Sequence, residues 1–479
     1  MKRHVERSMR RMGESVTAKM GLIVILILLF LIPLGMIRSL VSEREIRRNN
    51  AVEEAGARAG GRVVTGGPIL TVPYLVKRER EDGKPVTLRR FAHVLPRLLE
   101  ISGDVEPAER RRGIYRIPLY NATLGVHATF GPLEASLLGI DGGGLETVTA
   151  IKWEEAFLSL ELPDMRALKE TPRIRWDNRA LTSQAAAPSL GIFPAAAHVS
   201  PGAVIPEQQT RFSGEARAEL GKQFVAAHGI SHNVDIELHL GGAIALSFLP
   251  LGETTRVALN SPWQSPSFNG FVLPKERTVG ENGFTSRWLV LALNRGYPQH
   301  LAGTTQELDA IRASSFGVNF MLPVDHYDRT LRAVKYGILF ILLPFVVLFL
   351  FELFLKRRLH PLHYTLIGFS EVVFYLLLLS VSEHLEFNLA FLVSAGATTS
   401  LVTFYATAVL EKKRSGFLLG PFLLLLYAFL FLILQSEDYA LLLGSAGLFA
   451  ILSLFMIITR KVDWYGTENS RETREQREG

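Results

Sequence analysis

The stretch YGILFILLPFVVLFLFELFL, Tyr336–Leu355, contains one charged residue, Glu352, within an otherwise apolar run. A helix of this length rises 1.5 Å per residue and so covers about 30 Å, the thickness of the hydrocarbon core of a bilayer. The stretch therefore predicts a membrane-spanning helix. Five more runs of comparable length and composition predict further spans: Met20–Met36, Tyr364–Val381, Leu389–Leu410, Phe417–Leu434 and Ala440–Ile458.

The first of these runs, residues 20–36, resembles the apolar part of a signal peptide. It is longer than the usual apolar region of about 7–15 residues, and no A-x-A-like cleavage site follows in PLGMIRSLVS. We interpret it as an uncleaved membrane anchor that follows a cytoplasmic segment, residues 1–19.

Lysine and arginine residues flank alternate ends of the apolar runs. Short basic flanks remain on the cytoplasmic side of a membrane. The turns on the opposite side carry only acidic charges, such as Glu383, Glu386 and Glu437. This pattern predicts six spans with both termini in the cytoplasm, and it is set by basic residues that include Lys2, Arg3, Lys19, Lys356, Arg357, Lys412, Lys413, Arg460 and Lys461. The exceptions are Arg44, Arg47 and Arg48, which weigh less because they begin a long exported domain.

The long middle region, residues 41–334, is polar enough to form a soluble domain. Its first part, residues 41–60, favours a helical stalk that ends at Gly60 and Gly61. Alternation of apolar and polar residues in NVDIELHL and LGVHATF is typical of half-buried strands, and clusters such as IDGGG and GENG are typical of turns.

We therefore expect a large all-β, sandwich-like domain on the periplasmic side. It would be followed by a five-helix transmembrane bundle, residues 336–458, and a partly disordered cytoplasmic tail, residues 459–479.

The composition excludes several classes of site. The 479 residues include no cysteine, so disulfides, thiol nucleophiles and iron–sulfur clusters are excluded. The net charge of +6 reflects basic residues beside apolar runs, which argues for membrane orientation and against nucleic-acid binding. No phosphate loop, dinucleotide fingerprint or metallopeptidase motif occurs at a usable position. The sequence thus predicts no catalytic residues and no cofactor.

Two groups of histidines were weighed as ligands. His228 and His232 have the spacing of helical metal ligands, with His239 close behind, but Gly229 lies between them and no carboxylate completes a motif. An ordinary surface segment is the simpler interpretation, and we predict no metal site. His360 and His363, in RRLHPLH, fit contact with phospholipid headgroups or packing of a short loop better than ligation.

Glu371 is a candidate functional residue because it falls within the third apolar run. Ionisable groups in a membrane are costly and usually face the interior of a bundle. A structural hydrogen bond, a role in moving protons or ions, and an interfacial position all remain open. Glu352, near the end of the second run, could reach toward Lys356.

A second candidate site lies where the soluble domain meets the bundle. One group of its residues, 325–328, precedes the second apolar run by about two helical turns. The other group belongs to the acidic turn at 383–386, which lies beside the first if neighbouring spans pack together. Such charged groups could dock the domain on the bundle or coordinate a ligand, and docking is the simpler interpretation. The residues are Asp325, His326, Tyr327, Asp328, Glu383, His384 and Glu386.

Short strings spread over most of the chain resemble the CreD family of bacterial inner-membrane proteins, also called cell envelope integrity proteins. They are GGPILTVPY (66–74), RRRGIYR (110–116), SPWQSPSFNGFVLP (261–274), FGVNFMLPVDHY (316–327), RLHPLHYTLIGFS (358–370), FYLLLLSVSEH (374–384), ALLLGS (440–445) and TRKVDWY (459–465). The resemblance implies a multi-pass protein of the inner membrane with a periplasmic domain. It also implies a role in envelope integrity, linked in the family to colicin tolerance and cell-wall antibiotics, with no established catalytic residue.

Two functions follow as hypotheses. In the first, a non-enzymatic envelope protein binds an envelope protein or cell-wall partner through its periplasmic domain, and its bundle contacts membrane lipids. In the second, a transporter or membrane enzyme acts on an envelope lipid, with Glu371 in an intramembrane cavity. The sequence does not indicate the partner or the oligomeric state.

Overall fold

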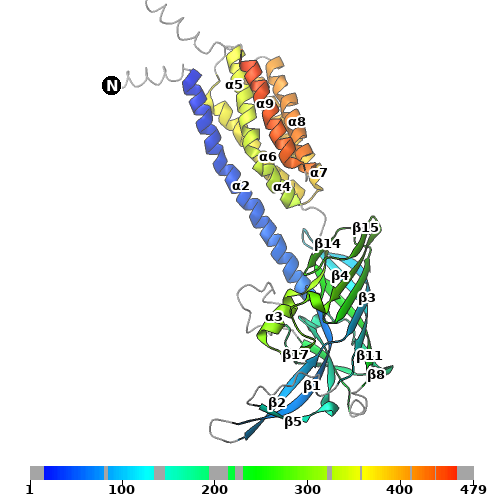
Figure 1. Ribbon diagram of the computed structural model, residues 1–479. Helices are drawn as coiled ribbons and strands as arrows, with labels where there is room; N and C mark the ends of the chain where they lie inside the picture. Colours follow the sequence, from blue (N-terminus) through cyan, green and yellow to red (C-terminus); the bar gives the residue numbers. More distant parts are fainter. Residues whose placement is uncertain are drawn as a thin grey trace, which may run out of the picture. The chain divides into compact units, whose positions relative to one another are not determined.

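The computed structural model describes residues 16–79, 85–133, 146–193, 214–221, 230–320, 326–355, 359–409, 413–436 and 439–460. The chain divides into two compact units. One unit comprises Met1–Ile46 and Val324–Gly479, and the other comprises Arg47–Pro323. The first is helical and the second is dominated by β-sheet (Figure 1).

The helical unit contains seven helices within the residues described. The first part of α2 (Val16–Arg58) packs with six others around a core of aromatic and aliphatic side chains that includes Phe30, Phe345 and Tyr427. Many leucines on the outer faces are exposed, as expected of helices that face lipid. The other helices are α4 (His326–Lys335), α5 (Gly337–Leu355), α6 (Pro361–Ser382), α7 (Phe387–Val409), α8 (Lys413–Gln435) and α9 (Ala440–Thr459).

Four of these helices, α2, α6, α7 and α8, are long and apolar enough to cross a membrane. Helices α4 and α5 meet at a bend of 45° and would form a fifth span if they cross together, while α9 contains a shorter apolar stretch, Leu442–Leu454. The described residues therefore contain four, or up to five, helices that are long and apolar enough to cross a membrane. The six-span arrangement goes beyond this and stays a prediction.

Close packing joins α2 to α6. Gly368 lies against Phe30, and a Cβ atom added at Gly368 would come 2.4 Å from the Phe30 ring. The same ring makes edge contacts with Phe345 and Phe369, at centroid distances of 6.1 Å and 5.1 Å. A small residue at this crossing allows the two helices to approach closely. Such crossings are common in membranes, where the hydrophobic effect does not drive helices together and close packing stabilises them.

The second unit contains a ten-stranded and an eight-stranded sheet. The central strand of the larger sheet is β1 (Val63–Glu79), which pairs with β2, β5, β6 and β12. Its other strands are β2 (Pro85–Val94), β5 (Glu146–Ile151), β6 (Phe157–Leu162), β9 (Ser183–Ala186), β10 (Gly214–Glu219), β12 (Ala245–Phe248), β14 (Pro266–Gly270), β17 (His300–Leu301) and β18 (Phe316–Phe320).

The smaller sheet has the strand order β15-β16-β13-β3-β4-β11-β7-β8. All neighbours are antiparallel except β13 and β3, which run parallel. The bounds are β3 (Leu98–Arg112), β4 (Tyr115–Phe130), β7 (Arg173–Trp176), β8 (Arg179–Leu181), β11 (His232–Ala243), β13 (Thr254–Ser261), β15 (Glu276–Gly280) and β16 (Gly283–Leu291).

One hydrophobic core joins the two sheets. The rings of Phe268 in β14 and Trp288 in β16 lie 5.7 Å apart, and the Tyr120 hydroxyl donates a 2.7 Å hydrogen bond to the carbonyl of Ala245. The predicted β-rich domain is therefore confirmed, and β11 and β4 carry the alternation seen in NVDIELHL and LGVHATF.

The expectation of an all-β domain is wrong in one element. Helix α3 (Thr305–Ala313) is part of this unit and buries Ile311 in its core. Its start carries a capping box, in which the Thr304 side chain accepts from the Glu307 backbone N–H and the Glu307 side chain accepts from that of Thr304. The T-x-x-E spacing is the sequence signal that could have revealed this helix.

Candidate functional site

A groove crosses the outward face of the eight-stranded sheet. It has a volume of about 740 Å³, within the range of ligand-binding pockets. Because β-strands alternate their side chains between two faces, the residues opposite the apolar core are those that line the groove. The strand register places Arg256, Glu100, His127, Asp235 and Arg175 side by side across five strands.

The neighbouring row has small residues at its centre. Ala258, Ser102 and Gly125 lie opposite one another on β13, β3 and β4, with Arg287 beside Ala258 and Glu237 beside Gly125. Small side chains between long charged ones leave a hollow. The groove therefore follows from which residues occupy adjacent register positions.

Ion pairs hold most of the charges that line the groove. His127 is hydrogen-bonded to Asp235 at 2.8 Å, and Arg256 forms an ion pair with Glu100 at 2.7 Å. Similar contacts join Arg173 to Glu237 at 3.4 Å and Arg287 to Glu276 at 3.0 Å. Such exposed pairs contribute about 0–1 kcal/mol each, so a ligand could rearrange them at low cost.

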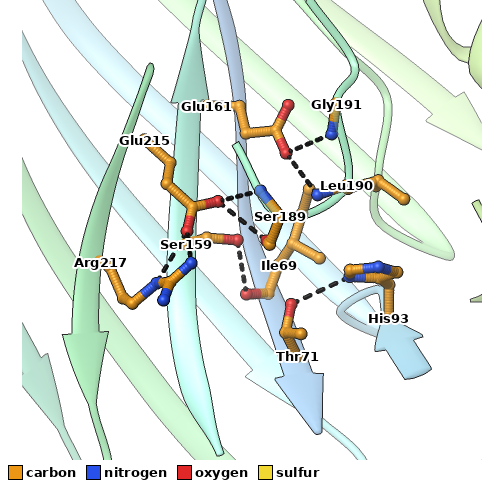
Figure 2. Close-up of polar contacts among 10 residues, drawn as sticks. All are labelled: Ile69, Thr71, His93, Ser159, Glu161, Ser189, Leu190, Gly191, Glu215 and Arg217. Atoms are coloured by element: carbon orange, nitrogen blue, oxygen red, sulfur yellow. Dashed lines mark hydrogen bonds and ion pairs between the residues drawn. The ribbon is translucent and has the colours of Figure 1, made fainter. Parts of the chain in front are cut away.

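Two buried glutamates form a second polar cluster, on neighbouring strands of the larger sheet (Figure 2). Glu161 and Glu215 are directly opposite in the pairing of β6 with β10, and both are fully buried. Glu161 accepts hydrogen bonds from the backbone N–H groups of Leu190, Gly191 and Ile192, at 3.0, 3.0 and 2.7 Å. The carboxyl group thus holds a segment that contains no regular secondary structure.

Glu215 completes the attachment of this segment. One of its oxygens accepts from both the backbone N–H and the hydroxyl of Ser189, each at 2.8 Å, and the other accepts from Arg217 at 2.6 Å. From the opposite side, Arg312 of α3 donates to the carbonyls of Ile192 and Gly191. Charged side chains therefore bind the backbone N–H groups of residues 189–192 and the carbonyl groups of residues 191 and 192.

Burial affects the ionisation of this region. It raises the pKa of the Glu161 carboxyl to about 7, although the three N–H groups favour the charged form. Burial also lowers the pKa of nearby His93 to about 4, so the ring that contacts the Thr71 hydroxyl at 3.0 Å is neutral at pH 7. The Ser189 hydroxyl is bound to the Glu215 carboxylate, whose other oxygen binds Arg217, so these contacts attach the segment 189–192 to the sheet.

Within the helical unit, two side chains of α2, Lys19 and Arg44, make polar contacts with other helices and loops. Lys19 binds the Glu352 carboxylate of α5 and also donates to the carbonyl of Leu359 at 3.0 Å, and the Tyr364 hydroxyl donates to Glu352 at 3.1 Å. Toward the other end of the apolar stretch, Arg44 lies 3.6 Å from Glu383. Lys19 and Arg44 are about 38 Å apart along the helix, which fits the thickness of a hydrocarbon core together with its interfaces.

The structure brings together two of the residues predicted at the junction. The Tyr327 hydroxyl, fully buried, donates a 3.0 Å hydrogen bond to Glu383, the C-cap residue of α6. Asp328, His384 and Glu386 are exposed. The rings of His326 and Tyr327 are tilted by 42° to each other, with 4.1 Å between their centroids. Asp325 lies outside the described residues, so its predicted place is untested.

The intramembrane candidate, Glu371, is fully buried in α6. Tyr427 of α8 donates a 2.7 Å hydrogen bond to one of its oxygens. In the described part of the bundle, the other oxygen and the Tyr375 hydroxyl have no hydrogen-bond partner. The predicted pairing of Glu352 with Lys356 falls partly outside the described residues, and the partner found for Glu352 is Lys19.

The histidines weighed as metal ligands have other surroundings. His232 is buried, bonds to Asp177 at 2.5 Å and packs on Trp176, while His239 lies 3.3 Å from Glu237. His228 falls outside the described residues. No group of three or more potential ligands that could hold a metal occurs in the part of the chain that the structure describes. His363 contacts the Tyr405 hydroxyl at 2.7 Å, a packing interaction between α6 and α7.

Sequence reasoning missed the groove, Glu161, Glu215 and the partners of α2. The signal for the groove was present in the polar half of the strand alternation, since Asp235 and Glu237 are the polar positions of NVDIELHL. Burial of Glu161 had no such signal, because FLSLEL reads as a strand with one polar face, whereas all six of its residues are buried.

A set of apolar helices joined in one chain to a two-sheet β domain defines an integral membrane protein with a large extramembrane domain. The chain matches the family described as inner membrane protein CreD over residues 15–465, and it belongs to the CreD family. It is 30% identical to the inner membrane protein CreD of Escherichia coli (strain K12) over 442 residues. These cover 92% of this chain and 91% of that protein.

Proposed function

We propose that this CreD-family protein supports cell envelope integrity and tolerance of envelope stress by binding an envelope partner in the groove of its β domain. The single observation that carries the proposal is the groove itself, about 740 Å³ in volume and lined by charged and small side chains. A sheet face that served only to shield a core would have no need of a hollow.

The proposed topology places the β domain in the periplasm and both termini in the cytoplasm, with six spans in the inner membrane. Its support comes from the basic flanks of the apolar runs. Reporter fusions after Gly280 and at Gly479 test this topology, and a cytoplasmic signal from the first or a periplasmic signal from the second contradicts it.

Envelope stress in cells tests the function. Gly125→Leu fills the floor of the groove, and Gly280→Leu is a matched control, because open space surrounds a Cβ atom added at Gly280. Cells that carry the first variant should lose tolerance to a cell-wall antibiotic or a colicin at wild-type protein levels, and cells with the control should keep it. Full tolerance with the filled groove contradicts the proposal.

One observation favours a second candidate, a transporter or membrane enzyme for an envelope lipid. The buried Glu371 has an oxygen without a partner among the described residues, and an unsatisfied buried polar atom can mark a functional site. In Glu371→Gln, the bond from Tyr427 can persist while the side chain can no longer bind or release a proton. Loss of stress tolerance with an unchanged unfolding temperature would support this candidate, whereas retained tolerance favours a structural hydrogen bond.

A further inference from the structure

The residues that form the floor of the groove are not those that strand stability favours. Gly125 lies in the interior of β4, where glycine weakens a strand and often marks a close approach by a ligand or another backbone. A Cβ atom added there would meet only Ser102, at 3.5 Å and 3.9 Å, which are ordinary contacts. The fold therefore does not require glycine at this position, and its effect is to keep the floor open.

The groove has an excess of positive charge. Its lining contains five lysine or arginine residues and four aspartate or glutamate residues. Three of these cations pair with carboxylates across the strands, whereas the exposed side chains of Arg175 and Lys275 make no ion pair or hydrogen bond with any residue that the structure describes. The two cations of the lining that have no ion pair, Arg175 and Lys275, together with the excess of one positive charge, favour an anionic ligand.

The chemistry of the lining narrows the class of ligand. An acyl chain would need a continuous apolar floor. Leu289 exposes an apolar side chain in the lining, but Ala258, Ser102 and Gly125 at the centre of the floor are small. A sugar would be favoured by an exposed aromatic platform, but Trp288, the aromatic residue of the lining, is only 2% exposed and belongs to the core. Charged side chains of both signs suit a polypeptide, and arginine binds carboxylates with two parallel hydrogen bonds.

The length of the groove suits an extended chain. Arg175 lies on β7, and Lys275 directly precedes β15, which is six strands away in the sheet. At about 4.8 Å between strands this separation is about 29 Å along the sheet, the length of about nine residues of extended polypeptide. We propose that the groove binds an extended acidic segment of a partner polypeptide, an inference that rests on the proposed function and names its ligand.

Fluorescence polarisation of labelled peptides on the full-length protein in detergent micelles tests this inference. The probe is a peptide of about ten residues that alternates glutamate and serine, compared with a glutamine–serine and a lysine–serine peptide. The acidic peptide should bind saturably, and more weakly at about 300 mM salt because the charges are exposed. Equal binding of the lysine peptide, or no binding of the acidic one, overturns the inference.

Matched variants locate the binding site. Arg175→Gln combined with Lys275→Gln should weaken binding by about tenfold, since each lost contact between exposed charges contributes up to about 1 kcal/mol. Arg111→Gln combined with Arg277→Gln removes two exposed cations that do not line the groove and should leave affinity within about twofold. All four changes are at exposed positions, so they preserve the core. Equal affinities of the two double variants overturn the inference.

Two comparisons separate failure of the inference from failure of the proposed function. If sulfated dextran, an anionic glycan, binds the groove in place of the acidic peptide, the polypeptide ligand is wrong. If Gly125→Leu abolishes stress tolerance while no acidic peptide binds to the wild-type protein, the result supports the proposed function and contradicts the proposed class of ligand. Unchanged tolerance in that variant contradicts the proposed function even if the peptide binds.

Discussion

The buried carboxyl of Glu161 makes the stability of the β domain depend on pH. Its pKa rises from an ordinary 4.5 to about 7 because burial disfavours the charged form. At pH values below 4.5 the group is protonated in both folded and unfolded chains. As the pH rises from 4.5 to about 7, the unfolded chain loses its proton first, so the free energy of unfolding falls.

The size of this effect follows from the raised pKa. Each pKa unit corresponds to about 1.4 kcal/mol, so the rise to about 7 corresponds to about 3 kcal/mol of stability lost between pH 4 and 8. Glu161→Gln cannot titrate. Relative to this variant, the wild-type protein should therefore lose about 3 kcal/mol as the pH rises over the same range.

His93 opposes Glu161, which makes the variant comparison essential. Burial lowers the pKa of His93 from 6.5 to about 4, so its contribution to stability is complete above pH 6.5 and is lost as the pH falls toward 4. The two effects largely cancel in the wild-type protein. Relative to His93→Gln, the wild type should gain about 3 kcal/mol as the pH rises from 4 to 6.5.

Urea unfolding of the full-length protein in detergent, followed by tryptophan fluorescence, measures these differences. Four of the five tryptophans, Trp153, Trp176, Trp263 and Trp288, lie in the β-domain unit, so the signal reports on that unit. A difference between the wild type and Glu161→Gln that does not change with pH, or that favours the wild type at high pH, would refute the reasoning. It would mean that the three N–H bonds outweigh the cost of burying the charge.

Three further variants concern the helical unit. Lys19→Met leaves the largely buried Glu352 carboxylate without its cation and should lower the unfolding temperature in detergent by several degrees, whereas Lys19→Arg should restore most of it. Tyr327→Phe removes the hydroxyl that binds Glu383 and should cost about 1–3 kcal/mol, measured by thermal unfolding, because the carboxylate loses a buried donor. Glu371→Ala removes the acceptor of the Tyr427 hydroxyl and should destabilise the bundle more than Glu371→Gln does; equal unfolding temperatures would count against this bond.

The sequence predicted the class of protein because its strongest signals are local. An apolar run such as Tyr364–Val381 identifies a helix long and apolar enough to cross a membrane, and the alternation in NVDIELHL identifies a strand. The bend between α4 and α5 was not predicted, although Gly337, the first residue of α5, stands at it. An isolated glycine within a helical pattern does not by itself distinguish a bend from a continuous helix. The helix α3 was missed although its capping box is visible in the sequence.

The contacts of the candidate sites could not be predicted, because each depends on residues far apart in the chain. Lys19 and Glu352 are 333 positions apart, and Tyr427 and Glu371 are 56 apart. Basic residues near an apolar run indicate orientation in a membrane, but only the packing of α2 on α5 shows that one of them binds a carboxylate.

The position of the groove depends on the register of the strands, which cannot be read from one strand alone. Gly125 lies between Leu124 and Val126, which are both buried in the core. A shift of β4 by one residue would turn these apolar side chains into the groove and place Gly125 in the core. The burial of Leu124 and Val126 therefore fixes Gly125 on the outward face, and pairing with β3 sets it opposite Ser102. The same hydrophobic pattern that stabilises the domain thus determines where its groove is open.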